Sequence, residues 1–477
     1  MTRLVGLDVG TSSVKGLAID QHGAVLAVAE RGYPLSTPRP GWAEQDPELW
    51  WEAANAVLDE IDGAAALAVG LSGQMHGLVA LDAKERPVRP AILWNDGRTQ
   101  AQCDEIERRL GRERLIELTG NRALAGFTAP KLLWLREHEP DNYAQIRSWL
   151  LPKDYVRLKL CEYHATDVTD ASGTLLFDVA QRRWSDEVVE ALELDPAWLP
   201  QAVESAESFC STHGGVPVAG GAGDQAAGAL GVGVVAEGGP ASVVLGTSGV
   251  VFAALDHYRA DPEARVHAFC HAVPDRWHVM GVMLSAAGSL RWLRDALGGE
   301  PDFDALLAEA AAWEPGVEGL LFAPYLAGER TPHADPAARG AFAGLTLRHD
   351  RGALARAVLE GVAFGLRDAL DLVESLGERP RVARVSGGGS RSAIWLEIVA
   401  SVLNLPLEVC AADEGAAFGA ALLGGVAAGV FADAPAAVEA CVRVTRTVEP
   451  RPDWVERYTE VLPRFRGLYP ALRPVTD

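Results

Sequence analysis

Two short segments, half a chain apart, share the pattern of an apolar strand, a Gly-Thr-Ser turn and a second strand. They cover residues 5–15 and 242–251 of the 477-residue chain. A turn of glycine and small hydroxyl residues offers backbone N–H groups and hydroxyl donors to an anion without bulky side chains in the way. The repeat therefore predicts a duplicated protein in which two hairpins hold the two ends of a triphosphate.

The two hairpins differ in one residue type, because only the first carries an aspartate, Asp8. A carboxylate beside bound phosphates is electrostatically unfavourable unless a cation lies between them, which suggests Mg²⁺ held directly or through water. The alternative is an aspartate that satisfies its own turn. The asymmetry indicates an enzyme whose halves share phosphate binding and divide the remaining chemistry unequally.

The charge of the chain excludes one class of partner. Its formal net charge is -22, and no Lys/Arg-rich run occurs in it. A protein that binds nucleic acid presents a basic surface to the phosphates, so we expect no nucleic-acid partner. An acidic protein that binds ATP must rely on local dipoles, backbone amides and a divalent cation.

Cysteine usage and the N-terminus indicate a cytoplasmic protein. The six cysteines lie tens of residues apart without framework spacing, and a strand containing Arg3 follows the N-terminus directly, so we expect reduced thiols and no signal peptide. Residues 415–432 carry no charge and reach the length of a membrane span. They are mostly alanine and glycine, which favours a buried helix, and we expect no membrane association.

Hydrophobic periodicity predicts a similar order of elements in both halves. In the first half we expect strands at 3–9, 14–20 and 24–30, a helix that begins at Asp46-Pro47, and a strand at 66–71. The second half predicts strands at 241–246, 249–255 and 277–284 and a helix near 286–297. We place the domain boundary near 237, giving domains 1–236 and 237–477.

A second repeat strengthens the duplication. Residues 224–231 and 413–422 are both Ala/Gly-rich and both begin at an aspartate near the end of their half. Small side chains let two helices approach closely, so we predict that this pair crosses between the domains as a hinge. The alternative is two ordinary buried helices.

Asp224 follows a glycine-rich strand end and precedes the first of these helices. We expect it to be exposed in the cleft between the domains and therefore ionised at neutral pH. It could then accept the proton of a substrate hydroxyl as that oxygen attacks a γ-phosphate. The alternative is an aspartate that only caps the helix.

Two further groups of residues complete the predicted site. The glycine run 386–390 lies between a strand at 381–386 and a helix at 393–403 and offers a flat floor for adenine and ribose. Residues 74–77 and 94–98 combine an aromatic ring with several hydrogen-bonding groups, the mixture that a polyol pocket needs.

In their order along nearly the whole chain, these motifs resemble the FGGY family of carbohydrate kinases, and within it the bacterial members that phosphorylate D-xylulose. The residues that carry the resemblance are 8–12, 74–77, 94–98, 126–134, 151–155, 246–250 and 324–332. The resemblance implies an α/β fold of two actin-like (RNase H-like) domains around a deep cleft. It also implies transfer of the ATP γ-phosphate, with Mg²⁺, to the 5-hydroxyl of the sugar.

The resemblance further implies residue roles. Asp224 is the catalytic base, and Asp8 acts near the metal and the phosphates. The first domain holds the sugar and the base, and the second holds most of the ATP. The implied sugar contacts are Met75, His76, Asp224 and Gln225, and the implied nucleotide contacts are Thr11, Ser12, Gly246, Thr247, Gly388, Gly389 and Ser390. Trp94 is a further candidate for the sugar wall, whereas Lys131 and Trp134 are expected to be structural.

One departure from the family pattern bears on the sugar. Gln225 follows Asp224 where many xylulose-specific members have Asn, and Asp-Gln is typical of the glycerol-specific members. Those members, however, have an aromatic residue at the position of Gly126 and Arg-Glu at the positions of Met75 and His76. The three residues present here favour a larger ketose.

Other readings remain open from the sequence. They are a kinase for another substrate (ribulose, ribitol, gluconate or glycerol), a catalytically inactive sugar sensor, and a non-kinase actin-like ATPase such as a chaperone or a filament protein. The chain offers little length for the peptide-binding domain that a chaperone would add. A homodimer is also left open.

Overall fold

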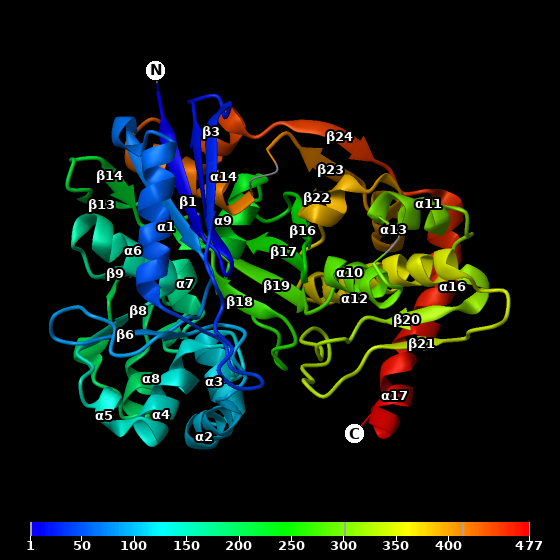
Figure 1. Cartoon of the computed structure of the whole chain (residues 1–477), viewed down its shortest axis with the longest axis horizontal. Coiled ribbons are helices and arrows are strands. Elements are labelled where there is room, and N and C mark those ends of the chain that lie inside the picture. Colours follow the sequence, from blue (N-terminus) through cyan, green and yellow to red (C-terminus); the bar gives the residue numbers. More distant parts are fainter. Residues whose placement is uncertain (1, 300–301, 413–414, 477) are drawn as a thin grey trace.

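The computed structural model describes residues 2–299, 302–412 and 415–476. It contains two seven-stranded sheets, one in each half of the chain (Figure 1). The first sheet has the strand order β13-β14-β5-β1-β2-β3, with β15 also paired to β5. Its strands are β1 (Leu4–Val9), β2 (Ser13–Ile19), β3 (Val25–Gly32), β5 (Ala68–Gly73), β13 (Ser208–Ser211), β14 (Pro217–Ala219) and β15 (Ala222–Gly223).

The second sheet repeats the arrangement of the first, in the order β18-β19-β17-β16-β22-β23-β24. In each sheet an antiparallel hairpin, β1-β2 or β16-β17, is followed by a strand parallel to its first member, β5 or β22. The strands are β16 (Ala241–Leu245), β17 (Gly249–Leu255), β18 (His267–Cys270), β19 (Trp277–Met283), β22 (Ala383–Ser386), β23 (Leu407–Cys410) and β24 (Val444–Val448). The predicted duplication is therefore confirmed at the level of strand topology.

One predicted boundary differs in a way that matters for the site. The strand expected at 66–71 is β5, which begins at Ala68 and ends at Gly73. Pairing with β1 sets these limits, from Leu4 opposite Ala68 to Val9 opposite Gly73. The segment 74–77 therefore follows the strand end directly.

Helices cover both faces of the first sheet (Figure 1). On one face, α1 (Pro47–Glu60) packs on β2 and β3 and on α6 (Pro152–Cys161). Asp46 accepts a hydrogen bond from the Glu48 N–H at the start of α1, as the Asp-Pro pair predicts. The other face contacts α14 (Gly415–Ala427), which comes from the second half of the chain.

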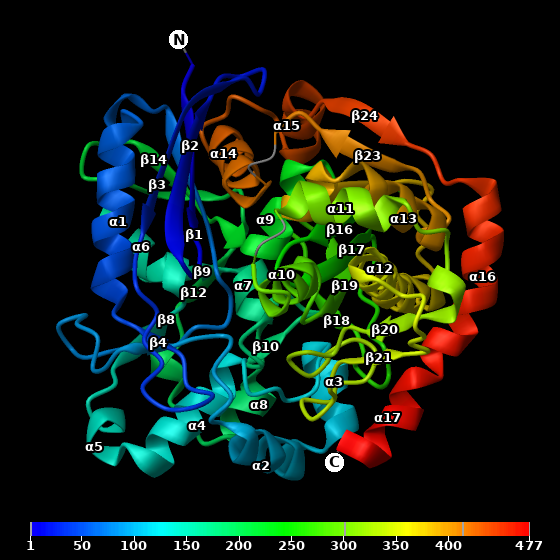
Figure 2. The ribbon, with the colours of Figure 1, turned by 45° about the vertical axis from the view of Figure 1, so that its right-hand side comes forward.

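The two Ala/Gly-rich helices, α9 (Asp224–Gly231) and α14, cross in direct contact beside the first sheet (Figure 2). A Cβ atom on Gly419 would lie 1.9 Å from the Ala227 carbonyl oxygen. One on Gly70 would lie 1.7 Å from the Ala420 carbonyl oxygen. Only residues without a side chain allow this approach, which confirms the predicted close crossing. Asp413, the predicted start of the second helix, lies outside the described residues.

Helices of the second half also pack on the strands of their sheet and on one another. The long helix α12 packs on β17, β19 and β20, and α13 packs between α12 and α16. Their bounds are α10 (Ala287–Ala296), α11 (Phe303–Ala311), α12 (Arg351–Ser375), α13 (Ala393–Leu403), α15 (Ala434–Cys441), α16 (Pro452–Arg466) and α17 (Leu468–Thr476), with β20 (Leu321–Ala323) and β21 (Ala341–Ala343) forming a small ribbon.

A helical lobe, formed largely by the segment between β5 and β13 of the first sheet, packs against the second sheet (Figure 1). Its hydrophobic cluster joins Phe127 and Trp149 of the lobe to Phe252 and Phe269 of the second sheet. The lobe contains α2 (Gln100–Leu110), α3 (Arg112–Thr119), α4 (Thr128–His138), α5 (Pro140–Tyr143), α7 (Val168–Ser172) and α8 (Asp186–Ala191), with the short strands β4 (Glu44–Gln45), β6 (Val79–Leu81), β7 (Ala91–Ile92), β8 (Ser148–Leu150), β9 (Ala165–Asp167), β10 (Phe177–Asp178), β11 (Arg183–Trp184) and β12 (Gln201–Val203). The halves thus share apolar cores.

The helices and the cysteines bear on two further expectations from the sequence. In the portion of the chain that the structure describes, no helix is long and apolar enough to cross a membrane. All six cysteines are free thiols.

Candidate active site

Two carboxylates project from the ends of neighbouring strands in the first sheet. Asp8 is the penultimate residue of β1, and Asp224 directly follows β15. Both strands run parallel to β5, with Asp8 opposite Ser72 and Gly223 opposite Gly73. The carboxyl ends of parallel strands are the usual position of a ligand in α/β proteins. Strand pairing therefore brings together two residues that are 216 positions apart in the sequence.

Asp8 and Asp224 line one cavity of about 290 Å³. Gln225 lies beside them, and the opposite side contains Ser386 and Gly387 from the second half. The cavity is therefore built by both halves of the chain, at the carboxyl ends of β1, β15 and β22. This is where the sequence analysis placed the cleft.

The carboxyl groups in this cavity are harder to ionise than an exposed aspartate. Burial raises the pKa of Asp8 from 3.8 to about 6. Burial, together with the negative charge of Asp8, raises the pKa of Asp224 from 3.8 to about 7. The expectation of an exposed, fully ionised Asp224 is therefore wrong, because the side chain is half-buried in the cavity wall. A base whose pKa lies near neutrality is well matched to proton transfer at that pH.

Asp224 does not cap its helix, which removes the structural alternative considered above. Gly223 occupies the N-cap position of α9, and Asp224 is the first helical residue. The Gly223 N–H instead donates to Thr169 Oγ1 at 2.8 Å. The Asp224 carboxyl group is thus left to face the cavity.

Asp8 has the properties expected of a metal ligand. Its Oδ1 atom is buried and has no hydrogen-bond partner among the described residues. A buried, unpartnered carboxylate oxygen is a suitable ligand for Mg²⁺, which prefers oxygen donors. Lys15 lies opposite Asp8 in the β1-β2 hairpin and lines the same cavity. Sequence reasoning missed Lys15, although the register of the predicted hairpin would have placed it beside Asp8.

Met75 lies against Gly223, the residue before Asp224, and the buried His76 follows Met75. A Cβ atom on Gly223 would come within 2.8 Å of Met75 Cγ and Sδ, so the two residues are in contact. His76 is buried, and its Nδ1 lies 2.7 Å from the Gly173 carbonyl oxygen. Burial and the positive charge of Lys131 lower the pKa of His76 to about 3. His76 is therefore a neutral imidazole.

Lys131 supports this segment, in agreement with the structural role expected for it. Its Nζ donates to the carbonyl oxygens of His76 and Gly126, each at 2.7 Å. Burial lowers the pKa of Lys131 to about 7. The Lys131 amino group thus holds the backbone of His76, a predicted sugar contact, close to the backbone of Gly126. Gly126 is the position at which the absence of a side chain favours a larger pocket.

The first Gly-Thr-Ser turn contacts the segments 74–77 and 94–98. Thr11 Oγ1 accepts a hydrogen bond from Trp94 Nε1 at 3.0 Å and lies 3.4 Å from Gln74 Oε1. Neither Thr11 nor Ser12 is among the residues that line the cavity with Asp8. The structure thus joins Thr11 to Trp94, whereas Asp96 and Arg98 of the same motif pair with each other.

The predicted nucleotide residues of the second half lie together. The Gly246-Thr247 turn follows β16, and the 3₁₀ turn Gly388–Arg391 follows β22, the parallel neighbour of β16. Gly387 allows their approach, because it has a positive φ of 86° and a Cβ atom there would lie 2.8 Å from the Leu245 carbonyl group. Gly388 and Gly389 line a neighbouring cavity of about 320 Å³ with Leu290 of α10 and Trp395 of α13. Ser390 is buried, and its hydroxyl donates to the Gly387 carbonyl oxygen at 2.7 Å.

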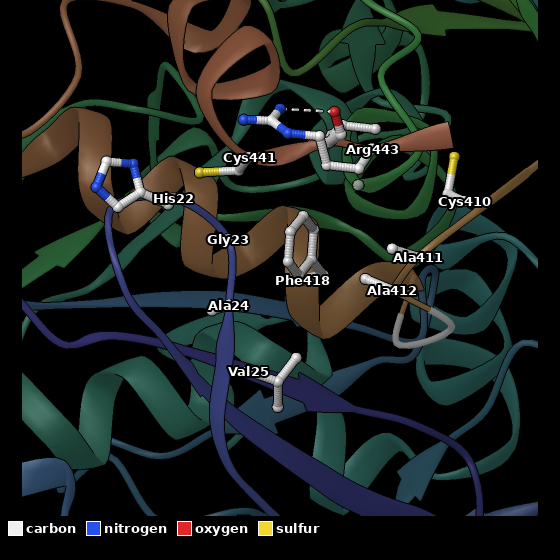
Figure 3. A pocket seen from close by; sticks show the side chains of 12 residues that line it. His22, Gly23, Ala24, Val25, Cys410, Ala411, Ala412, Phe418, Cys441 and Arg443 are labelled. Atoms are coloured by element: carbon white, nitrogen blue, oxygen red, sulfur yellow. Dashed lines mark hydrogen bonds between the residues drawn. The ribbon is translucent and has the colours of Figure 1, made fainter. Parts of the chain in front are cut away.

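A separate cavity of about 320 Å³ lies where the β2-β3 turn meets the segments around Cys410 and Cys441 (Figure 3). Phe418 of α14 forms part of its wall, and Arg443 donates to the Val442 carbonyl oxygen at 2.9 Å. None of the predicted site residues lines it, and no carboxylate is found among the described residues that do. This cavity therefore lacks the groups that the predicted chemistry requires.

Comparison with protein-family models gives two adjacent matches. The N-terminal domain of the FGGY family of carbohydrate kinases matches residues 3–231. The C-terminal domain of the same family matches residues 241–428.

Individual relatives match over the full length. A xylulose kinase of Escherichia coli (strain K12) is 42% identical over 488 residues, which cover 99% of this chain and 99% of that protein. The crystal structure of a xyloylose kinase from Brucella ovis has a TM-score of 0.93 and 42% identity, covering 99% of this chain and 100% of that one. The crystal structure of a gluconate kinase from Lactobacillus acidophilus has a TM-score of 0.93 and 26% identity. The match covers 99% of this chain and 98% of that one. These structures share the two-domain fold described above.

Proposed function

Since this chain belongs to the FGGY family of carbohydrate kinases, we propose that it transfers the γ-phosphate of ATP to the 5-hydroxyl of D-xylulose. Relatives named xylulose kinase match it at up to 42% identity over nearly the whole chain. The product is D-xylulose 5-phosphate.

The observation that carries the proposal is the shared cavity of Asp8 and Asp224. Two carboxylates of the first half face Ser386 and Gly387 of the second. A sugar bound to one half and ATP bound to the other would therefore meet in front of Asp224. Closure of the two halves would align the hydroxyl with the γ-phosphate and exclude water.

Asp224 acts as the general base. Its ionised carboxylate accepts the proton of the 5-hydroxyl as that oxygen forms a bond to the γ-phosphorus, and the bond from that phosphorus to the β–γ bridging oxygen breaks. The second product is ADP. The raised pKa of Asp224, about 7, keeps it a competent base at neutral pH and lets it release the proton afterwards.

Asp8 holds the phosphate end of ATP through a cation. Its unpartnered Oδ1 faces the same cavity as Lys15. Mg²⁺ bound there would offset the charge of the phosphates. Lys15 supplies a positive charge of the chain itself on the same wall, while Gly387 lets the phosphates approach the backbone.

The sugar occupies the space beside Met75 and His76. The neutral His76 donates its Nδ1–H to the Gly173 carbonyl oxygen, which leaves Nε2 to accept a hydrogen bond from a sugar hydroxyl. Gly126 adds no side chain in front of Trp94, so the pocket has room for a five-carbon ketose. Gln225 lines the cavity next to the base and can orient the same substrate.

The test is a coupled assay of kcat/KM over a panel of D-xylulose, D-ribulose, ribitol, D-gluconate and glycerol. We expect D-xylulose to have the highest value, by about tenfold or more, because the pocket is shaped by Gly126, Met75 and His76. A higher value for another substrate would reassign the sugar while keeping the kinase chemistry. ATP-driven polymers with no phosphorylation of any substrate would instead favour a filament protein. The cytoplasmic location is a prediction from the sequence.

A further inference from the structure

A cavity of about 450 Å³ lies next to the proposed sugar contacts and is lined by both halves of the chain. Trp94, Arg122 and Gly126 come from the first half, and Glu329 and Arg330 come from the second. The roles proposed above use only Trp94 and Gly126 of these residues. The two arginines have no assigned function.

No ion pair among the described residues balances the charge of either arginine. Arg122 Nε is buried without a hydrogen bond, and in the part of the chain that the structure describes neither guanidinium group forms an ion pair or hydrogen bond. A guanidinium group has five N–H donors and is charged at any physiological pH. Two such groups in one half-buried cavity are unfavourable unless an anion compensates them.

The acidic groups of the cavity wall form their hydrogen bonds with groups other than these two guanidinium groups. The Glu329 carboxyl group accepts hydrogen bonds from the backbone N–H groups of Leu284 at 3.0 Å and Arg330 at 2.7 Å. Burial raises the pKa of Glu329 to about 8, so this group is largely protonated at neutral pH. The other carboxylate of the wall, Asp96, forms a bidentate pair with Arg98.

One wall of the cavity adjoins the segment that contains His76. Lys131 links the carbonyl oxygens of His76 and Gly126, so the segment that contains His76 adjoins the cavity wall. Arg330 is close enough for its charge to lower the pKa of His76. A Cβ atom on Gly126 would lie 3.8 Å from the Arg330 guanidinium group, so Arg330 lies beside the residue that Lys131 links to His76.

We propose that Arg122 and Arg330 form a subsite for the carboxylate or phosphate group of an anionic sugar derivative. Guanidinium groups bind both oxyanions through paired N–H···O bonds. One arginine comes from each half, so the anion would also bridge the halves at the sugar end of the cleft. The proposal deepens the proposed function, because it places an acidic sugar in the pocket of the same kinase.

The test is calorimetric titration of the full-length protein, without ATP, with D-gluconate and with D-glucitol. The two ligands have the same carbon skeleton, but D-gluconate ends in a carboxylate at C1 where D-glucitol has a hydroxymethyl group. We expect D-gluconate to bind at least about tenfold more tightly, and Arg122→Gln and Arg330→Gln each to remove about tenfold of that preference. Arg330→Lys keeps the positive charge and should therefore retain more of the preference for D-gluconate than Arg330→Gln does. Arg112→Gln, an exposed arginine outside the cavity, is the matched control.

Competition with inorganic phosphate distinguishes the two sources of the anion. Displacement of D-gluconate by phosphate would show that the subsite accepts phosphate esters, whereas no displacement would restrict it to carboxylates. Equal affinities for D-gluconate and D-glucitol, or a preference that survives both glutamine substitutions, would overturn the proposal. D-Xylulose phosphorylation measured on the same preparation tests the proposed function separately, since the binding assay contains no ATP.

Discussion

The backbone N–H of Gly223 donates a hydrogen bond to Thr169 Oγ1 at 2.8 Å, one residue before Asp224. Thr169 Oγ1 in turn donates to Asp167 Oδ1 at 2.5 Å, and Lys153 Nζ lies 2.7 Å from Asp167 Oδ2. The three side chains are fully buried. A chain of polar groups within the protein thus holds the backbone from which the proposed base projects.

This relationship predicts that Thr169→Val lowers kcat more than it changes the KM for D-xylulose. Valine has nearly the same shape but leaves the buried Gly223 N–H without an acceptor, at a cost of about 1–3 kcal/mol. We expect kcat to fall by about tenfold, because the Asp224 carboxylate shifts relative to the hydroxyl. Thr169→Ser restores the acceptor and should recover most of the rate. A valine variant with unchanged kcat would contradict the positioning role.

Replacement of the proposed base gives a second prediction. Asp224→Asn keeps the shape of the side chain but cannot accept the proton, so kcat should fall by roughly 10²–10⁴ or more. ATP affinity, measured by calorimetry, should stay within about twofold of the native value. A near-native kcat would assign the base to another group.

The raised pKa of Asp224 makes the stability of the ligand-free protein depend on pH. In the folded protein this carboxyl releases its proton near pH 7, but in the unfolded chain near 3.8. Between these values the folded state binds the extra proton, so the free energy of unfolding falls as pH rises through that window. Above pH 7 the full loss from this group is up to about 4 kcal/mol.

Asp224→Asn removes this penalty and should therefore raise Tm relative to the native protein at pH 8, with the difference disappearing near pH 4. Asp8→Asn should raise Tm by a smaller amount, because burial raises the pKa of Asp8 only to about 6. This increase in Tm should reach its full size at about pH 6 and stay constant above it. Thermal unfolding without nucleotide and metal at several pH values measures both. A Tm difference for Asp224→Asn that is independent of pH would contradict the assigned shift.

Adjacent glycines in the second half provide a matched comparison. Gly387 has a φ of 86°, and a Cβ atom there would lie 2.8 Å from the Leu245 carbonyl group, whereas one on Gly388 would meet nothing within 4 Å. We expect Gly387→Ala to displace the ATP loop at a cost of about 1–3 kcal/mol and to raise the KM for ATP by about tenfold. Gly388→Ala should change Tm by less than about 1 °C. Equal effects on Tm would show that the close approach is not required.

Local patterns predicted much of the secondary structure. The Asp-Pro pair at 46–47 starts α1, and the glycine run after Ser386 separates β22 from α13, as expected from turn and cap chemistry. The two Gly-Thr-Ser turns identified the duplication, and the glycines of α9 and α14 indicated the close crossing. These features depend on neighbouring residues, which is why a single sequence reveals them.

The environment of the site residues could not be read in the same way. The sequence predicted an exposed Asp224, but in the folded chain this side chain is half-buried in the cavity wall. Lys15 became a candidate only through its pairing with Asp8 in the β1-β2 hairpin. Arg330 was part of a recognised motif, yet nothing near it in the sequence shows that it lines the same cavity as Arg122.

The sequence by itself determined the duplicated α/β fold, the family resemblance and the residue types needed for phosphoryl transfer. Those properties follow from periodicity, turn residues and motifs, which are local or repeated along the chain. Only the tertiary structure decided that Asp8 and Asp224 share one cavity, that their carboxyl groups titrate near neutrality, and that two arginines are left unpaired. Burial and charge are sums over groups that meet in space, so segments distant in the sequence must first be brought together.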